Sequence, residues 1–384
     1  MQYGKKRKYD ELMEDLRAQI LGGTIKPGEK LLSENRLAAD YQVSRQTVRK
    51  ALAILEEEGF VYAEHGRGTF CSKLLRSAKP SRNIAVVMTY LSDYIFPRVI
   101  QGIDQVLTDE GYSILLKNTK NSRSVEARCL EELLQKDIDG LIIEPSKSHI
   151  FCKHMNLYEL LDQKGIPYVF IQGCYAQMED KPHILLDDCM GGYLVTKYLI
   201  SLGHRRIIGV FKSDDIQGQE RHKGYVRALQ EAGLGYDPDR VIWYYTEDRR
   251  QHPYQKMRQL ARAHGRQPFD AVVAYNDQVA IDVIRALEEE HLFCPQDVSV
   301  TGYDDSCLAV TGKVPLTTIA HPQEELGRMA AELLLRILRK EEIMDTQRQV
   351  RIMPELVIRE SCRGLNGMGG GRAKEHGGGK EIDL

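Results

Sequence analysis

The feature of this sequence that most constrains its fold is a long alternation of short strand-like runs with helix-like segments. The strand-like runs, rich in β-branched and other apolar residues, are 84–90, 113–117, 140–144, 168–171, 207–211, 271–275 and 298–303. Segments with apolar residues at helical spacing fall at 97–110, 125–135, 189–202, 221–232, 279–290 and 323–338. Such alternation predicts parallel sheets covered by helices. It extends over about 280 residues, more than one hydrophobic core normally spans, so we predict an α/β fold with two lobes.

Polar side chains follow six of these strands, where ligands of α/β proteins usually bind. The loops read "TYLSDYIFP", "EPSKS", Gln172, "FKSDDIQGQER", "YNDQ" and "GYDDS". An Asp after one strand more often caps the next helix than binds a ligand. Six polar loops at one sheet edge instead predict a ligand site. Arg, Asp, Asn and Gln beside Tyr and Phe suit a sugar, because they serve its hydroxyl groups and its C–H faces.

The first eighty residues have a different character. "VSRQTVRKAL" (43–52) predicts a helix capped by Ser44, with an apolar stripe from Val48 to Leu55. Its first two turns leave a polar and basic face outside. In a helix-turn-helix these turns enter the major groove, where Arg reads guanine and Gln reads adenine. For an isolated helix, the alternative is a solvated basic face.

The surrounding segments favour the DNA-binding interpretation. Apolar spacing predicts a first helix over 9–22, and Ser33 caps a short second helix. "GFVYAEHGRGTFCS" (59–72) predicts a hairpin with a basic tip between glycines. Three helices and a hairpin make a winged helix. Residues 1–82 carry a net charge of +5 and the remainder −7, so only this part is expected to meet a polyanion.

The stretch "KPGEKLLSENRLAADYQVSRQTVRKALAILEEEGFVYAEHGRGTF" resembles the DNA-binding domain of the GntR family of bacterial regulators. The resemblance covers about 65 residues and several ordered motifs. It implies contact with double-stranded operator DNA. The residues it places at or near DNA are Lys8, Ser33, Glu34, Arg36, Ser44, Arg45, Gln46, Thr47, Arg49, Lys50, His65, Gly66 and Arg67. For Glu34 and His65 a purely structural role is the alternative.

The remainder resembles the LacI and periplasmic sugar-binding family. The phrases that carry the resemblance are "LGHRRIIGVF", "RHKGYVRALQEAGL", "FDAVVAYNDQVAIDVIRAL" and "CPQDVSVTGYDDS". It implies two α/β lobes joined by three crossovers, with a small-molecule sugar effector between them. The implied effector contacts are Tyr94, Phe96, Glu144, Gln172, Gln217, Arg221, Asn276, Asp304 and His321. The LacI family's own DNA-binding head and hinge helix are absent.

A GntR-type head on a LacI-type body resembles a family of arabinose-responsive bacterial repressors. The phrases "TYLSDYIFPRVIQGI", "DGLIIEPSKS" and "FKSDDIQGQ" strengthen this resemblance. It implies a homodimer that binds its operator when free and releases it when L-arabinose closes the cleft. One hydroxyl's orientation can turn on a side-chain rotamer, so another pentose or a hexose stays open as the effector. The expected domains are 1–72, a linker over 73–82, the body over 83–363 and a disordered Gly-rich tail over 364–384.

Other classes of protein are weighed against this one. Adjacent Asp pairs, such as Asp187 with Asp188, suggest an enzyme, but neighbours on a strand point to opposite faces. The sequence has no Walker A, zincin or nucleophile-elbow motif, and its eight scattered cysteines have no CxxC pair, so we expect neither catalysis, cofactor nor metal. A secreted binding protein is the third class. The charged N-terminus and the lack of a membrane-length apolar run lead us to expect a cytoplasmic protein.

Overall fold

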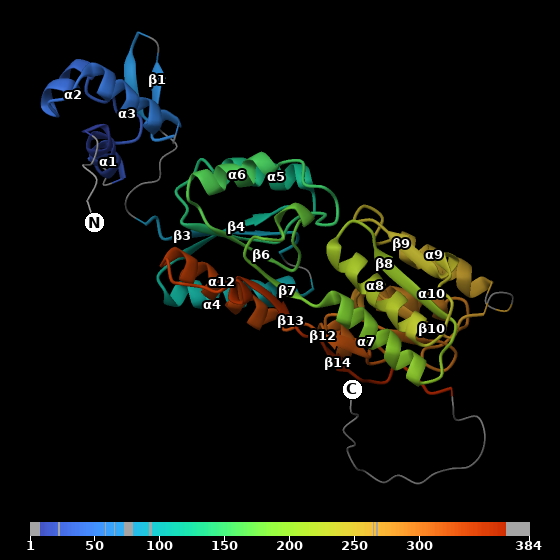
Figure 1. The fold of residues 1–384 in the computed structure, drawn as a ribbon. Helices are drawn as coiled ribbons and strands as arrows, with labels where there is room; N and C mark the ends of the chain where they lie inside the picture. The colour runs from blue at the N-terminus through green and yellow to red at the C-terminus, as the bar shows by residue number, and fades with distance from the viewer. Residues whose placement is uncertain are drawn as a thin grey trace.

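The structure is a computed structural model that describes residues 8–21, 24–57, 59–64, 66–72, 80–91, 94–263, 265 and 268–365. Figure 1 shows a small N-terminal winged helix and a body of two α/β lobes. The predicted tail lies outside the described residues from 366 onward, as do His65 and most of the predicted linker. No helix of the described part is long and apolar enough to cross a membrane.

The winged helix forms around the predicted apolar stripe. Its elements are α1 (Lys8–Leu21), α2 (Glu34–Asp40), α3 (Arg45–Glu57), β1 (Val61–Glu64) and β2 (Gly68–Cys71). Val48, Ala51, Leu52 and Leu55 of α3 are all buried, together with Leu12 and Leu16 of α1 and Leu37 of α2. The strands β1 and β2 pair antiparallel as the predicted wing. Burying one face of α3 leaves its basic face in solvent.

The first lobe is built on a six-stranded parallel sheet in the order β13-β7-β6-β5-β3-β4. Its strands are β3 (Asn83–Met88), β4 (Ser113–Asn118), β5 (Gly140–Ile143), β6 (Tyr168–Ile171), β7 (His183–Leu186) and β13 (Gln349–Ile352). The helices α4 (Phe96–Asp109) and α12 (Gln323–Leu338) pack on one face, whereas α5 (Arg123–Leu133) and α6 (Met155–Gln163) cover the other (Figure 1). Both faces of the sheet are therefore buried, as expected for parallel strands.

The second lobe has a four-stranded parallel sheet in the order β11-β10-β8-β9. Its strands are β8 (Ile207–Lys212), β9 (Val241–Tyr244), β10 (Ala271–Ala274) and β11 (Ser299–Thr301). Helices α9 (His252–Arg262) and α10 (Asp277–Glu288) pack on one face, and α7 (Asp188–Ser201) and α8 (Ile216–Glu231) on the other. The shorter elements are η1 (Ala176–Met178), η2 (Pro238–Arg240), α11 (Leu308–Thr311) and α13 (Asp345–Arg348).

The chain crosses between the lobes three times, from β7 to α7, from β12 (Thr318–Ala320) to α12, and from β13 to β14 (Glu355–Val357). β12 and β14 pair antiparallel beside these crossings. The predicted fold class, a winged helix with a two-lobed α/β body, is confirmed. All seven strands predicted for the body are present, but β7, β9, β12, β13 and β14 were not predicted.

Two glycines bring α7 and α8 into close contact. A Cβ atom on Gly192 would lie 2.1 Å from the carbonyl oxygen of Arg221, and one on Gly224 would lie 2.0 Å from that of Cys189. Both distances are far below van der Waals contact, so any larger residue would force the helices apart. This close packing brings Asp188, at the start of α7, next to Arg221 on α8.

Candidate functional site

Helix α3 begins as the sequence predicted. Ser44 Oγ accepts a hydrogen bond from the backbone N–H of Thr47 (3.1 Å), and Ser33 Oγ accepts one from that of Arg36 at the start of α2 (3.4 Å). Each serine satisfies a backbone donor that the helix itself leaves free. Ser33 and Ser44 therefore have a structural role in the winged helix whatever else they contact.

The two arginines of the α3 basic face share one carboxylate. Glu34 Oε2 lies 2.9 Å from Arg49 Nε and 3.4 Å from Arg45 Nη2. The side chains of Arg45 and Arg49 are still 59% and 64% exposed. Glu34 can therefore orient both guanidinium groups while most of their donors face solvent. Exposed ion pairs of this kind are weak, so the arginines are free to exchange Glu34 for a phosphate or a base.

The other predicted DNA contacts lie around these arginines and at the wing. Gln46 and Lys50 are exposed on α3, and the Lys50 ammonium lies 4.5 Å from the centre of the Tyr9 ring. Arg67 is 72% exposed at the tip of the wing, where it pairs with Glu64. Gly66 at the same tip has a φ of +75°, which favours glycine. The side chain of Lys8 is outside the described part of the structure, as is His65.

A cavity of about 660 Å³ lies between the two lobes. Eight of the nine residues predicted to contact the effector line it: Tyr94, Phe96, Glu144, Gln172, Gln217, Arg221, Asn276 and Asp304. The ninth, His321, is buried beside it, with Nε2 2.9 Å from Gln172 Oε1. Burial lowers the pKa of His321 to about 4, so this histidine is neutral at pH 7. The cavity therefore gathers residues that are more than two hundred positions apart in the sequence.

Arg221 is the central charge of the cavity and is only 3% exposed. Its Nε donates to Asp188 Oδ1 (2.8 Å) and its Nη1 to the carbonyl oxygen of Tyr275 (2.6 Å). The guanidinium carbon lies 3.5 Å from the centre of the Tyr303 ring and 4.6 Å from that of Tyr275. Arg221 is thus held by a carboxylate, a carbonyl group and two aromatic faces. These contacts fix the direction in which its remaining N–H groups point.

Asp304 is the buried acceptor next to this arginine. Its Oδ1 lies 3.5 Å from Arg221 Nη2, and within the described part of the chain this oxygen has no hydrogen-bond partner. The backbone φ of Asp304 is +95°, an uncommon value for a residue other than glycine. Gln172, with a φ of +66°, likewise has an Nε2 without a partner among the described residues. A buried donor and a buried acceptor without partners indicate a polar ligand at this place.

Tyr94 differs from the other predicted contacts because its hydroxyl already joins the lobes. The hydroxyl donates to the carbonyl oxygen of Tyr303 (3.0 Å) and accepts from the backbone N–H of Asp277 (3.1 Å). With its hydroxyl engaged, Tyr94 offers mainly its ring to the cavity. Phe96 lines the same side, near the ring of Tyr90. Aromatic faces of this kind suit the C–H surface of a sugar.

Glu144 of the first lobe and Lys212 of the second also line the cavity. Burial raises the pKa of Glu144 to about 7, although Thr89 donates to its carboxylate through both N–H (2.9 Å) and Oγ1 (2.5 Å). Burial by itself would lower the pKa of Lys212, but Asp215 and Asp214 raise it above its ordinary value. Lys212 Nζ lies 2.9 Å from Asp215 Oδ2. The cavity lining thus combines a readily protonated acid with a fixed cation.

Several cavity residues were not predicted as contacts: Thr89, Lys212, Asp215 and Tyr275, with Asp188 directly behind Arg221. Lys212 is the last residue of β8, and Tyr275 directly follows β10, so both occupy the strand ends where ligands bind. Their place at the strand ends could have identified both residues from the sequence. Among the described residues there is no group of three or more His, Cys, Asp or Glu side chains that could hold a metal ion.

Comparison with known families agrees with both parts of this structure. Residues 8–71 match the family of bacterial regulatory proteins named gntR, and residues 196–362 match the periplasmic binding protein-like domain. The first range covers the winged helix, and the second runs from within α7 through the rest of the second lobe and on through α12 and β13 of the first. The match agrees with the division into a head and a body.

Solved structures share the architecture of the body or of the whole chain. A transcriptional regulator CelR in complex with cellobiose is 25% identical, with a TM-score of 0.65, and covers 94% of this chain and 100% of its own. A LacI family transcriptional regulator from Enterococcus faecium with bound ribose is 26% identical, with a TM-score of 0.60, and covers 74% and 99%.

Two curated relatives are similar over almost the whole chain. The arabinose metabolism transcriptional repressor of Halalkalibacterium halodurans is 40% identical over 363 residues, which cover 92% of this chain and 96% of the relative. That of Geobacillus stearothermophilus is 38% identical over 357 residues, which cover 93% and 98%. Both relatives span the winged helix as well as the two lobes, and the chain therefore belongs to the family of arabinose metabolism transcriptional repressors.

Proposed function

We propose that this protein is a transcriptional repressor that binds operator DNA through its winged helix and releases it when L-arabinose occupies the cavity between the lobes. The observation that carries the sugar site is the buried pair of Arg221 and Asp304. Arg221 is fixed by Asp188, and Asp304 presents an oxygen without a hydrogen-bond partner among the described residues. A guanidinium and a carboxylate side by side can each hold two hydroxyl groups. A sugar is the common ligand with adjacent hydroxyls and no charge.

The switch follows from the position of the cavity. Residues of both lobes line it, so a sugar that contacts both stabilises the arrangement in which they are close together. If that arrangement holds the two winged helices of a dimer away from the spacing of the operator, sugar and DNA oppose each other. The coupling is reciprocal: operator DNA then lowers sugar affinity by the same factor.

We infer that DNA is read by α3. Arg45, Gln46 and Arg49 lie exposed on its first two turns, and Arg67 at the wing suits a phosphate or the minor groove. The relatives are transcriptional repressors, and a homodimer is the assembly that fits a two-fold symmetric operator. We expect half-sites about one helical turn apart, or a multiple of it. The protein then acts in the cytoplasm, where its DNA lies, by binding rather than catalysis.

The direct test measures DNA release. The operator is first selected from random duplexes with the full-length chain, and its fluorescence anisotropy is then followed during titration with L-arabinose, D-xylose, D-ribose and D-glucose. Release by L-arabinose at the lowest concentration supports the proposal. Preference for another sugar would keep the mechanism and replace the effector. Sugar binding without any change in operator affinity would refute the mechanism.

A further inference from the structure

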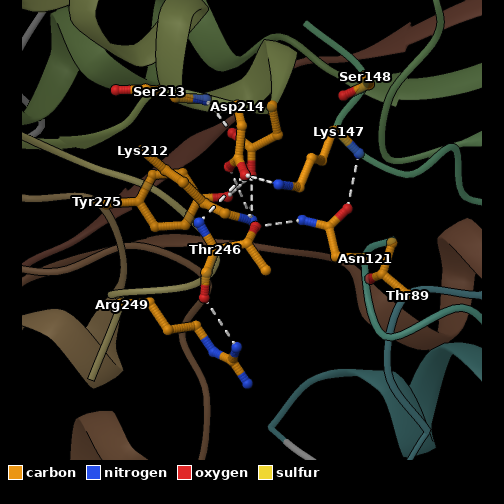
Figure 2. A network of polar contacts seen from close by, with 12 residues as sticks. Thr89, Asn121, Lys147, Ser148, Lys212, Ser213, Asp214, Thr246, Arg249 and Tyr275 are labelled. Atoms are coloured by element: carbon orange, nitrogen blue, oxygen red, sulfur yellow. Dashed lines mark hydrogen bonds and ion pairs between the residues drawn. The ribbon is translucent and has the colours of Figure 1, made fainter. Parts of the chain in front are cut away.

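A second set of polar contacts joins the two lobes beside the cavity. Figure 2 shows Lys147 and Asn121 of the first lobe facing Asp214 and Thr246 of the second. We call this set the lobe clamp and define it as Asn121, Lys147, Asp214, Thr246 and Glu247. All five residues lie on loops that follow strands of the two sheets, at the edges that face each other across the lobe boundary.

The clamp consists of an ion pair and a hydrogen-bonded amide. Lys147 Nζ lies 3.4 Å from Asp214 Oδ2 and also pairs with Glu247. Asn121 Nδ2 donates to Thr246 Oγ1 (2.7 Å), and its Oδ1 accepts from the backbone N–H of Lys147 (2.7 Å). Asn121 therefore performs two tasks: it contacts the second lobe directly, and it fixes the loop that carries Lys147.

Burial makes the ion pair sensitive to lobe separation. The side chain of Asp214 is fully buried and that of Lys147 is only 16% exposed. The backbone N–H of Thr246 donates to Asp214 Oδ2 (3.1 Å), while Asp214 Oδ1 has no hydrogen-bond partner among the described residues and lies 3.9 Å from Lys212 Nζ. If the lobes part, Asp214 loses the cation of Lys147. The attraction between Lys147 and this shielded carboxylate exists only while the lobes are together, so the pair favours the closed arrangement.

The backbone of the first lobe is held in an uncommon conformation at this rim. Lys120, Asn121 and Lys147 have φ values of +52°, +53° and +50°. Such left-handed residues are uncommon outside glycine and persist only where surrounding contacts fix them. Here Asn118 Oδ1 accepts from the Lys120 N–H (2.9 Å), and Asn121 holds Lys147. The loop is therefore prearranged to direct Lys147 across the boundary.

The charged pair acts beside the ligand site rather than in it. Lys147 and Asp214 are not among the described residues that line the cavity, whereas Lys212 is. Lys212 lies between Asp214 and Asp215, and Asp215 Oδ2 accepts a hydrogen bond from the Tyr275 hydroxyl (2.8 Å). Of the clamp residues, Asn121 lines the cavity, and Asp214 lies near the lining residue Lys212, while the Lys147–Asp214 pair itself is not part of the lining.

We propose that Lys147 and Asp214 are positioning residues that set effector affinity by holding the lobes closed, without contacting the effector. This inference rests on the proposed function. A ligand that binds only the closed arrangement has an apparent dissociation constant that rises as the closed fraction falls. Loss of the clamp therefore weakens binding of every sugar by one common factor and leaves the preference among sugars unchanged.

The first test uses the full-length chain with Lys147→Met, which keeps the length of the side chain and removes its charge. We expect the dissociation constant for L-arabinose, measured by calorimetry, to rise about 5- to 20-fold, within the usual range of such couplings. The ratio between L-arabinose and D-xylose stays within about twofold of wild type. Lys181→Met is the matched control, because Lys181 pairs with Asp162 inside the first lobe (2.9 Å), and it leaves both quantities unchanged.

Three further variants keep the test decisive. Asp214→Asn also weakens sugar binding. The double variant Lys147→Met with Asp214→Asn binds sugar as well as the more impaired of the two single variants, because both substitutions remove the same interaction. Lys147→Arg keeps the positive charge and therefore keeps the sugar affinity of wild type. Unchanged affinity in Lys147→Met, an altered sugar preference, or additive effects in the double variant would each overturn the inference.

Solution scattering separates this inference from the proposed function. Without sugar, Lys147→Met has a larger mean radius of gyration than wild type and the Lys181→Met control. If wild type binds no sugar but this difference is present, the clamp stands and the proposed effector fails. If wild type binds sugar while all three chains have the same radius, the clamp inference fails and the proposed function stands.

Discussion

Asp304→Asn separates sugar binding from folding more cleanly than any other change in the cavity. The substitution keeps the size of the side chain, and asparagine tolerates the φ of +95° that residue 304 adopts. It removes the charge of an oxygen that has no hydrogen-bond partner within the described residues. Arg221 keeps its 2.8 Å contact with Asp188 and loses only the 3.5 Å approach to Asp304.

The expected magnitudes follow from this geometry. A hydrogen bond to a charged group contributes about 1.5–3 kcal/mol, so sugar affinity falls about 10- to 150-fold. Stability without sugar behaves differently. Burial raises the pKa of Asp188 to about 6 and of Asp277 to about 7, and the negative charge of Asp304 adds to both shifts. Removing that charge relieves this repulsion but also weakens the attraction to Arg221. The two effects offset each other, so we expect the free energy of unfolding to change by less than about 1 kcal/mol and Tm by less than about 4 °C.

Calorimetry with L-arabinose and thermal unfolding without it measure the two quantities separately. Asp305→Asn is the matched control, because Asp305 is the neighbouring acid but pairs with Arg359 (2.7 Å) away from the residues lining the cavity. We expect the control to keep wild-type sugar affinity. In the operator assay, Asp304→Asn stays bound to DNA at sugar concentrations that release wild type. Sugar affinity within threefold of wild type, or a large loss of Tm without sugar, would refute this reasoning.

Three other outcomes follow from the structure. Arg45→Ala removes about 1–3 kcal/mol of the preference for the correct base at one position of the operator, which anisotropy with singly substituted operators will measure. An equal loss of affinity for all operators would indicate a phosphate contact instead. Arg221→Ala leaves buried carboxylates unpaired and destabilises the sugar-free protein by about 3–5 kcal/mol, and adding Asp188→Asn restores part of the lost Tm; a wild-type Tm in the single variant would contradict this. Folded Glu144 keeps its proton up to about pH 7, whereas the unfolded group loses it near 4.5, so its contribution to stability falls as pH rises between these values. Glu144→Gln therefore loses less Tm than wild type between pH 5 and pH 8, by the equivalent of roughly 3 kcal/mol, and identical pH profiles would argue against a buried, protonated Glu144.

Much of the fold was open to prediction because local patterns carry it. The caps at Ser33 and Ser44 and the apolar stripe of α3 depend on neighbours within a few residues, and the structure confirms them. The strands β3, β5 and β8 are continuous apolar runs, as buried parallel strands require. β7 ("HILL") and β9 ("VIWY") were missed although they are as long as β5, because four residues show no period that separates a strand from a loop or a helix end.

The cavity shows most clearly which features the sequence determines and which depend on the tertiary structure. The sequence by itself determined which loops would meet, because the carboxyl ends of parallel strands share one edge, and the family resemblance selected residues such as Arg221 and Asp304. Only the tertiary structure decided that Asp188 holds Arg221, that the Tyr94 hydroxyl is used between the lobes, and that Lys147 reaches Asp214. These pairs depend on the packing of α7 against α8 and on how the two lobes meet. Such contacts join residues far apart in the chain, and no local periodicity or propensity encodes the distance between them.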